Sequence, residues 1–538
     1  MKNMAGNWTI RRRLLPSLSD LVFSTTLAYL LLFGQGPSTL LVDSDTGWHI
    51  RAGEWILDNL AVPRQDLFSF SKPGQEWFAW EWLSEALFAG IHRAAGLSGL
   101  VLAAGILIAL TFALLYRLMR RQGSNPVLSA GLAFLAAYAA SIHWLARPHL
   151  SSWLLALAFY WILEQTPIER RRIYWLAPLT ALWTNLHGSF VLGVAMVGVY
   201  GVGELIRAAL VERPERRASL QRAAGYGFLL GACAMATLVN PYGVRVHWHV
   251  LRYLNDSYIF NHITEFFSPN FHAPAARFFE VLLLAGVACA VWAVRQGRYA
   301  QALLVAGFAH AGLQSARHIP IYAIFAAPLI AAAATRLLAQ AAATQRAGWR
   351  RSLLSGWERF GADVGAIDSR PRVYALSGLV VLTAMAVLWV PRPGGPPERQ
   401  AQFSTRVFPV AAADHLEKMR FAGNVFSTDQ WSGYLLYRAF PRIKVFMDGR
   451  SDYYGQKMGE EYLKLLGVHH TWQHTLDRYG VETALLPADS ALAGALKESA
   501  RWSVAYDDGV AILFHRTGAS RRWMAGAGVV EQRQVARQ

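Results

Sequence analysis

The stretch from Leu97 to Tyr116 reads LSGLVLAAGILIALTFALLY and contains no charged side chain. As an α-helix these residues would be about 30 Å long, which matches the thickness of the hydrocarbon core of a bilayer. Inside that core an α-helix satisfies its own backbone hydrogen bonds. Apolar and polar residues do not alternate here, as they would in a strand of a membrane β-barrel. The stretch therefore predicts a transmembrane helix.

Ten further apolar runs share this character, so the sequence predicts a polytopic α-helical membrane protein with about eleven transmembrane helices. Only 16% of the residues are charged, against about a quarter in soluble proteins. The predicted spans are Leu18–Gly34, Leu97–Tyr116, Val127–Ile142, His149–Leu163, Ile173–Thr184, Ser189–Ile206, Ala223–Val239, Phe278–Val294, Tyr299–Gln314, Ile319–Thr335 and Val373–Val390.

The basic residues between the runs predict the orientation in the membrane. If the N-terminus is cytoplasmic, the N-terminal segment and the five inner connections hold 24 Lys and Arg, and the five outer connections hold 9. Basic connections stay on the cytoplasmic side. We therefore expect a multi-pass protein of the cell (inner) membrane with a cytoplasmic N-terminus and an extracytoplasmic C-terminal domain. The net charge of +17 reflects these clusters, so a nucleic-acid partner is not indicated.

The chain is expected to divide into a transmembrane domain and a small soluble domain. Short apolar strands alternate with helical segments near the C-terminus, which is typical of an α/β domain. The predicted strands are Asn424–Ser427, Ile443–Met447, Val481–Leu486 and Val510–Phe514. The predicted divisions are a transmembrane domain 1–390 with a long outer loop 35–96, a Pro- and Gly-rich linker 391–402, an extracytoplasmic α/β domain 403–516, and a disordered tail 517–538.

The sequence Asp43-Ser44-Asp45-Thr46-Gly47-Trp48-His49 directly follows the first predicted span. Apolar residues then recur at helical spacing from Trp48 to Leu60, which predicts an amphipathic helix on the membrane surface, and a second such helix is expected at Trp80–His92. In one interpretation Asp45 or Thr46 only caps the first helix. In the other, the carboxylate is a general base or a metal ligand at the membrane surface.

An Asp-containing motif after the first span, a surface helix, many spans and an outer soluble domain together resemble the GT-C superfamily of polyprenyl-phosphate-sugar-dependent glycosyltransferases. Protein mannosyltransferases and aminoarabinose transferases of this superfamily carry an Asp-Glu pair at that place, onto which Asp45-Thr46 falls. The chain looks closest to uncharacterised bacterial members. The resemblance implies an inverting transferase with Asp45, and Asp43 beside it, as catalytic residues. Thr46 replaces the Glu of the family, which leaves the metal requirement open.

Polar residues at the outer ends of other spans are candidates for substrate binding. Arg147-Pro148-His149 and Arg317-His318 could hold the phosphate of the leaving group, or the arginines could simply reach the membrane interface. His49 and His187 are further candidates, although Asn185-Leu186-His187-Gly188 also reads as a plain turn. The histidines could converge on a divalent metal ion, but their spacing matches no known ligand motif.

Two motifs in the soluble domain each follow a predicted strand, where α/β domains tend to place binding residues. They are Asp448-Gly449-Arg450 and the segment Ser427–Tyr434. The second faintly resembles the acceptor-reading motif of oligosaccharyltransferases, but the order of its residues differs, so no role is carried over.

The favoured function is transfer of a sugar from a polyprenyl-phosphate donor to an extracytoplasmic glycan, lipid or protein acceptor. The alternatives are a transporter or lipid flippase of the cell envelope, and a non-catalytic membrane protein of envelope assembly. A transporter would be expected to carry charged residues deep in several spans. In this sequence the ionisable residues gather at one face.

Overall fold

The computed structural model describes residues 15–34, 36–344, 348–370, 372–390 and 400–517. The basic cluster Arg11–Arg13, most of the predicted linker and nearly all of the predicted disordered tail lie outside these residues. The described chain forms two compact units, which are described separately. Unit 1 comprises residues 1–40, 98–244 and 263–400, and unit 2 comprises residues 41–97, 245–262 and 401–538.

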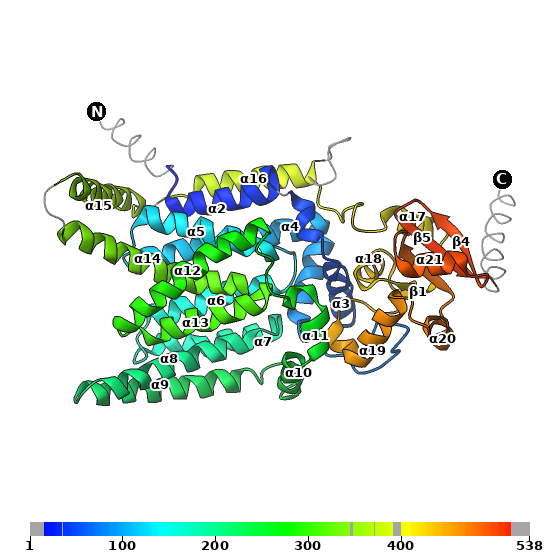
Figure 1. The fold of residues 1–538 in the computed structure, drawn as a ribbon, viewed down its shortest axis with the longest axis horizontal. Helices are drawn as coiled ribbons and strands as arrows, with labels where there is room; N and C mark the ends of the chain where they lie inside the picture. Colours follow the sequence, from blue (N-terminus) through cyan, green and yellow to red (C-terminus); the bar gives the residue numbers. More distant parts are fainter. Residues whose placement is uncertain (1–14, 35, 345–347, 371, 391–399, 518–538) are drawn as a thin grey trace. The chain divides into compact units, whose positions relative to one another are not determined.

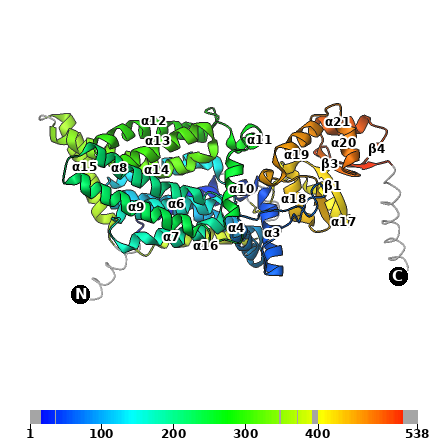
Figure 2. The same ribbon diagram turned by 90° about the horizontal axis from the view of Figure 1, so that it is seen from below.

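Unit 1 is a bundle of helices that lie alongside one another (Figures 1 and 2). Each of the eleven predicted spans coincides with a helix. The helices of unit 1 are α2 (Leu18–Ala28, continued by the π-helix Tyr29–Phe33), the second part of α4 (Trp82–Arg121), α5 (Pro126–Ala140), α6 (His149–Gln165), α7 (Leu176–Leu186), α8 (Phe190–Leu210), α9 (Glu215–Ala236), α12 (Pro274–Arg295), α13 (Tyr299–Gln314), α14 (Ile319–Thr344), α15 (Trp349–Asp368) and α16 (Ala375–Trp389).

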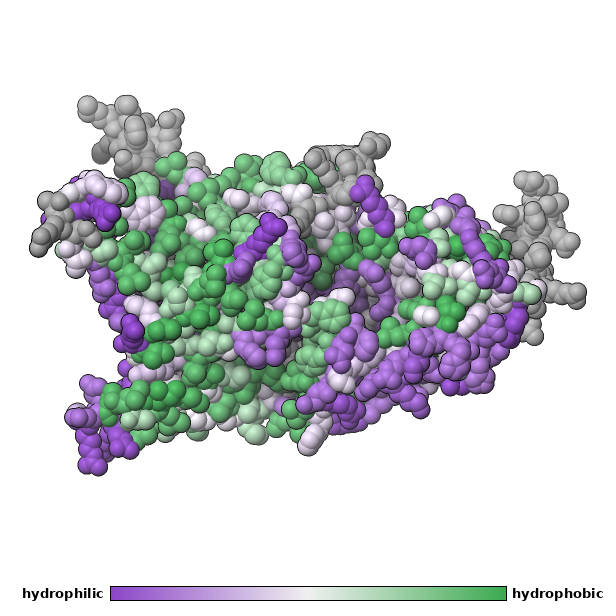
Figure 3. Space-filling view, viewed as in Figure 1, coloured by the Kyte–Doolittle hydropathy of each residue, from purple (hydrophilic) through white to green (hydrophobic). Residues whose placement is uncertain are grey.

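Five helices in the described part of the chain are long and apolar enough to cross a membrane. They are Trp82–Arg121, Pro126–His143, Phe190–Leu210, Pro274–Arg295 and Ala316–Thr344. On α12 the exposed side chains Val281, Leu284, Val287 and Val291 form an apolar stripe, which a membrane would cover. Figure 3 shows the same hydrophobic surface over much of unit 1. The architecture is that of a helical membrane protein, and the full number of eleven spans stays a prediction.

Helix α4 contains two helices joined at Gly96, whose φ of 61° interrupts the helical backbone. Glycine reaches this left-handed region without the steric cost that a Cβ brings. The part before Gly96 belongs to unit 2 and corresponds to the predicted helix Trp80–His92, and the part after it belongs to unit 1.

Unit 2 contains a five-stranded sheet in the order β2-β1-β3-β5-β4. Strand β1 pairs parallel with β2 and β3, whereas β5 pairs antiparallel with β3 and β4. The strands are β1 (Gly423–Ser427), β2 (Ile443–Val445), β3 (Thr483–Pro487), β4 (Trp502–Asp507) and β5 (Ala511–Arg516). The sequence predicted the other four but not β4, whose residues are mostly exposed and therefore lack an apolar run.

The helices of unit 2 come from three separate parts of the chain. They are α3 (Asp45–Asn59), the first part of α4, α10 (Arg245–Leu254), α11 (Ser257–His262), α17 (Val410–Lys418), α18 (Asp429–Ala439), α19 (Ser451–Leu466), α20 (Trp472–Arg478) and α21 (Ala491–Glu498). Side-chain caps fix two of their starts, because Thr428 accepts from the N–H of Trp431 and Ser490 accepts from the N–H of Ala493.

The long loop 35–96 adds its own residues to the sheet of unit 2. The N–H of Val445 in β2 donates to the carbonyl of Phe68, and the N–H of Phe70 donates to the carbonyl of Val445. Ser69 thus pairs with the edge strand in a parallel bridge. Since an unpaired sheet edge exposes backbone donors and acceptors, this pairing ties the loop to the soluble domain.

Candidate active site

The predicted site residues fall into two groups. Unit 2 holds Asp43, Asp45 and His49. Unit 1 holds the remaining candidates, which are Arg147, His149, His187, Arg317 and His318.

Asp45 is the first residue of α3 and is only 7% exposed. Its Oδ1 accepts a hydrogen bond from Nε1 of Trp48, one helical turn later, at 3.0 Å. The N-cap position is Ser44, without a side-chain cap, and Oδ1 of Asp43 accepts from the N–H of Asp45 at 2.8 Å. The interpretation that Asp45 or Thr46 caps the helix is therefore wrong, because the preceding carboxylate binds the backbone and Asp45 starts the helix.

Helix α3 packs against the soluble domain through close backbone approaches. A Cβ on Gly47 would lie 2.5 Å from the carbonyl oxygen of Gly433 in α18, and a Cβ on Gly433 would lie 2.5 Å from Oγ of Ser44. The apolar residues Ala52 and Ile56 on the same helix are buried. Much of the face that was predicted to rest on the membrane surface is thus buried in protein, and Leu60 at its end is exposed.

Gly449 lies against the carboxylate of Asp45. A Cβ at this position would be 1.9 Å from Oδ1 of Asp45, far inside any allowed contact. Only a residue without a side chain leaves the carboxylate where it is. The central glycine of Asp448-Gly449-Arg450 therefore helps to define the position of Asp45.

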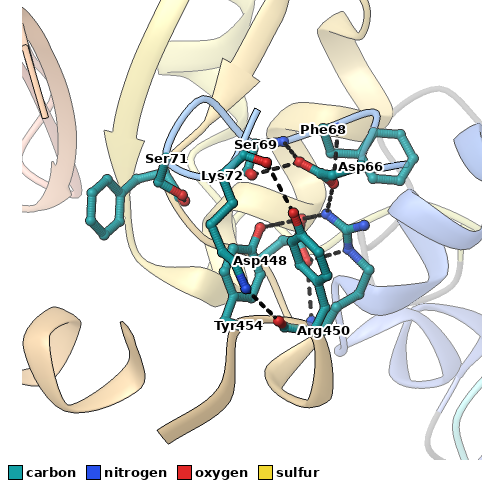
Figure 4. Close-up of polar contacts among 10 residues, drawn as sticks. Asp66, Phe68, Ser69, Ser71, Lys72, Asp448, Arg450 and Tyr454 are labelled. Carbon is teal, nitrogen blue, oxygen red and sulfur yellow. Dashed lines mark hydrogen bonds and ion pairs between the residues drawn. The ribbon is translucent and has the colours of Figure 1, made fainter. Parts of the chain in front are cut away.

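Arg450 anchors this motif in a buried ion network (Figure 4). Its Nη2 donates to Oδ1 of Asp66 at 2.7 Å and to Oδ2 of Asp448 at 2.7 Å, and its Nε donates to Oδ1 of Asp448 at 2.8 Å. Tyr454 donates its hydroxyl to Asp448, and Ser69 donates both its N–H and its hydroxyl to Asp66. The network joins the loop 35–96 to the soluble domain through residues far apart in the sequence.

Charge balance explains how such a network can be buried. Arg450 is 2% exposed, and burial alone would lower the pKa of its guanidinium, but Asp448 and Asp66 raise it. Burial alone would likewise raise the pKa of Asp66, but Arg450 and the bonds from Ser69 hold it below its usual value. Aromatic rings surround the guanidinium, with those of Trp77 and Phe68 centred 4.6 and 4.8 Å from its Cζ.

His49 lies in the same unit, with its ring tilted by 35° against that of Trp48 and the ring centroids 3.6 Å apart. Its Nε2 is 3.7 Å from Oε2 of Glu81, and its Nδ1 is 3.6 Å from Oε1 of Glu85. The side chain is 1% exposed. His49 is therefore packed between an aromatic ring and two carboxylates, about one helical turn after Asp45 on α3.

In unit 1 the candidate residues gather around Glu265. Arg147 forms an ion pair with Glu265, and both side chains are one-fifth exposed. Burial opposes ionisation of Glu265, but Arg147, His143 and Arg317 hold its pKa at about 2. The guanidinium of Arg317 lies over the ring of Phe266, the residue after Glu265, with its Cζ 4.4 Å from the ring centroid.

His187 is held by two serines. Its Nδ1 accepts from the N–H of Ser189 at 3.1 Å and lies 2.7 and 3.0 Å from the hydroxyls of Ser189 and Ser152. Because Nδ1 accepts from a backbone N–H, the proton of the neutral ring is on Nε2. Burial, with the nearby Arg317 and Arg147, lowers the pKa of His187 to about 3. This histidine is neutral at pH 7.

The other two candidate histidines of unit 1, His149 and His318, lie at the starts of helices. His149 begins α6, where its Nε2 is 3.1 Å from the carbonyl oxygen of His143, and the two imidazole rings are 4.3 Å apart. His318 precedes α14 and lies edge-on to Phe308. Unit 1 thus brings Arg147, Arg317 and three predicted histidines to one set of helix ends.

The metal requirement, which the sequence left open, stays open. In the ranges that the structure describes, no three His, Cys, Asp or Glu side chains are grouped so that they could hold a metal ion.

Asp66 and Glu265 carry much of the geometry, although neither was among the site residues predicted from the sequence. The signal in Asp448-Gly449-Arg450 was its position after a strand. Its partner Asp66 is 384 positions from Arg450, a separation at which the sequence carries no local signal.

No family model and no curated protein sequence matches the chain. Solved structures do. The archaeal oligosaccharyltransferase AglB of Archaeoglobus fulgidus, in complex with an inhibitory peptide and a dolichol-phosphate, aligns with a TM-score of 0.53 at 11% identity over 88% of this chain and 69% of that one.

Two further structures of the Archaeoglobus fulgidus oligosaccharyltransferase align similarly. The form tethered to an acceptor peptide containing the NVT sequon has a TM-score of 0.54 at 12% identity, covering 87% of this chain and 68% of that one. The complex with Zn and sulfate has a TM-score of 0.51 at 12% identity, covering 88% and 68%. The alignment spans nearly the whole of this chain, so the chain has the fold of the archaeal oligosaccharyltransferase, in agreement with the fold expected from the resemblance to the GT-C superfamily.

Proposed function

We propose that the protein is a membrane glycosyltransferase that moves a sugar from a polyprenyl-phosphate donor to an acceptor outside the cytoplasm. The fold supports the class of enzyme. The observation that carries the proposal is the carboxylate of Asp45, which is buried at the start of α3 and positioned by Trp48 and Gly449.

The chemistry assigned to Asp45 is general-base catalysis. A hydroxyl of the acceptor is a weak nucleophile until a base takes its proton in the transition state. Asp45 would accept that proton while the acceptor oxygen forms a bond to the anomeric carbon of the donor sugar. The bond from that carbon to the phosphate oxygen breaks at the same time, its electron pair leaves with the polyprenyl phosphate, and the configuration at the anomeric carbon inverts.

The N-terminal end of α3 supports the ionised state that a base needs. Backbone N–H groups at the start of a helix create a positive partial charge, which favours a carboxylate there. The bond from Trp48 also stabilises the carboxylate and fixes its rotamer. Asp43 would support the reaction indirectly, because its carboxylate binds the backbone of Asp45.

The phosphate of the donor is assigned to the cationic cluster of unit 1. A guanidinium can bind a phosphate through two parallel hydrogen bonds. Arg147 and Arg317 both lie close enough to Glu265 to lower the pKa of its carboxyl. His149, neutral His187 and His318 would contribute polar contacts to the donor. Glu265 pairs with Arg147, so it would keep that guanidinium in place before the donor binds.

The purified protein, incubated with a panel of polyprenyl-phosphate sugars, tests the proposal directly. Release of free polyprenyl phosphate together with transfer of the sugar to a water-side acceptor is the expected result. The neighbours in the comparison bind a dolichol-phosphate and an acceptor peptide, so short peptides belong in the acceptor panel beside glycans and lipids. Consumption of none of the donors would contradict the proposed class of enzyme.

A further inference from the structure

Helices α14 and α15 and the turn between α4 and α5 line an open cavity of about 340 Å³ that the proposed transferase activity does not use. All of the residues that line it belong to unit 1. Figure 1 shows α15 beside α14. From the turn come Arg120, Ser124, Asn125 and Pro126, and from α15 come Trp357, Glu358, Gly361 and Gly365.

Two hydrogen-bond donors of the cavity have no partner in the described residues. Oγ of Ser124 and Nε1 of Trp357 are both buried and make no hydrogen bond there. Ser124 is only 1% exposed. A buried donor without an acceptor costs about 1–3 kcal/mol, so a bound acceptor would remove this cost.

The charge around these donors favours an anion. The guanidinium of Arg120 lines the cavity, where one of its N–H groups donates to the carbonyl of Ser124. Helix α5 begins at the cavity wall with Pro126, and the start of a helix carries a positive partial charge. Glu358 is the opposing charge among the lining residues.

Close backbone contact keeps α15 in place over the cavity. A Cβ on Gly361 would lie 2.1 Å from Nδ2 of Asn125, and a Cβ on Gly365 would lie 2.9 Å from Nη2 of Arg120. The two glycines, one helical turn apart, let the helix approach the turn that carries the donors.

The opposite edge of α15 indicates what kind of molecule carries the anion. Trp349, Leu353, Phe360 and Ile367 are more than half exposed, and their spacing of four and seven residues puts them on one stripe of the helix. Exposed arginines at positions 350 and 359 flank that stripe. An apolar stripe with flanking basic residues is the pattern of a helix that lies in the headgroup region of a membrane.

We propose that this cavity binds the phosphate of an anionic phospholipid, while the apolar stripe of α15 rests among the acyl chains. Ser124 and Trp357 would donate to the phosphodiester oxygens, and Arg120 would balance the charge. The lipid would thereby hold α15 against the bundle.

Native mass spectrometry of the full-length purified protein, titrated with phosphatidylglycerol, tests the proposal. The wild type should bind one phosphatidylglycerol more tightly than phosphatidylcholine. Ser124→Ala and Trp357→Phe should each weaken the binding about tenfold, because each removes one hydrogen bond to a charged oxygen. Glu358→Gln should strengthen it about threefold, because it removes a negative charge from the cavity.

Matched controls are Ser355→Ala on α15 and Trp175→Phe in the 3-10 helix Arg171–Trp175, whose residues do not line the cavity. Both should bind phosphatidylglycerol like the wild type, and all variants should melt within a few degrees of it. Unchanged binding in both Ser124→Ala and Trp357→Phe would overturn the proposal. Inorganic phosphate that binds as tightly as the lipid, with the same dependence on Ser124, would also overturn it, because the ligand would then be a free anion.

Discussion

Replacing Gly449 by Ala should misplace the proposed base without removing any functional group. The new Cβ would be 1.9 Å from Oδ1 of Asp45, whereas real Cβ contacts are essentially never below 3.0 Å. The carboxylate or the Gly449 backbone must therefore move by about 1 Å, and a misplacement of this size costs roughly 10²-fold in rate. Arg450 and Asp448 hold the backbone on one side, so we expect the carboxylate to give way.

The assay is turnover of the donor identified in the sugar panel, with saturating acceptor, for wild type and Gly449→Ala at equal concentration. Gly494→Ala is the matched control, because Gly494 lies in helix α21 of the same unit and a Cβ there would meet nothing within 4 Å. That variant should keep full turnover. If Gly449→Ala, correctly folded by its melting temperature, turned over within about threefold of wild type, its close contact with Asp45 would not matter to catalysis and the reasoning would be refuted.

Three further predictions concern the ion network, the donor and the topology. The pKa of Asp66 is lowered in the folded state, so its carboxylate stabilises the protein above pH 3.8, the pKa of the unfolded state, and this stability is lost as the pH falls further. Asp66→Asn should therefore flatten the decline of the melting temperature below about pH 4, and an unaltered curve would show that the ion pair adds no pH-dependent stability. Arg317→Ala should weaken donor binding by about 1.5–3 kcal/mol in a binding titration, and unchanged affinity would remove Arg317 from the donor site. Single cysteines at the exposed positions Gln75 and Asp489 should react with an impermeant maleimide in intact cells, and protection of either until lysis would reverse the predicted orientation.

Local patterns in the sequence were enough for most of the architecture. Each predicted span coincides with a helix, because apolar runs of this length and the breaks between them are local features. The helix beginning at Asp45 and the one ending at the Gly96 break were predicted from spacing alone. Strand β4 was missed, because an exposed edge strand lacks the apolar run by which the other strands were recognised.

The details of the candidate site depended on contacts between distant residues. The pairing of Arg450 with Asp66, the fit of Gly449 against Asp45 and the pairing of Arg147 with Glu265 each join segments more than a hundred residues apart. Motif reading singled out Asp45, Arg147 and Asp448-Gly449-Arg450 but could not show which residues they contact. The membrane-surface prediction for α3 failed in part for the same reason, since this helix packs against α18, which lies far along the chain.

Turnover of Asp45→Asn tests the central claim most directly. Asn keeps the shape of the side chain and can still accept from Nε1 of Trp48, but it cannot serve as a base at neutral pH. The account predicts a folded protein with wild-type donor affinity and a turnover reduced by about 10²–10⁴, the usual contribution of general-base catalysis. A folded Asp45→Asn protein with wild-type turnover would contradict it.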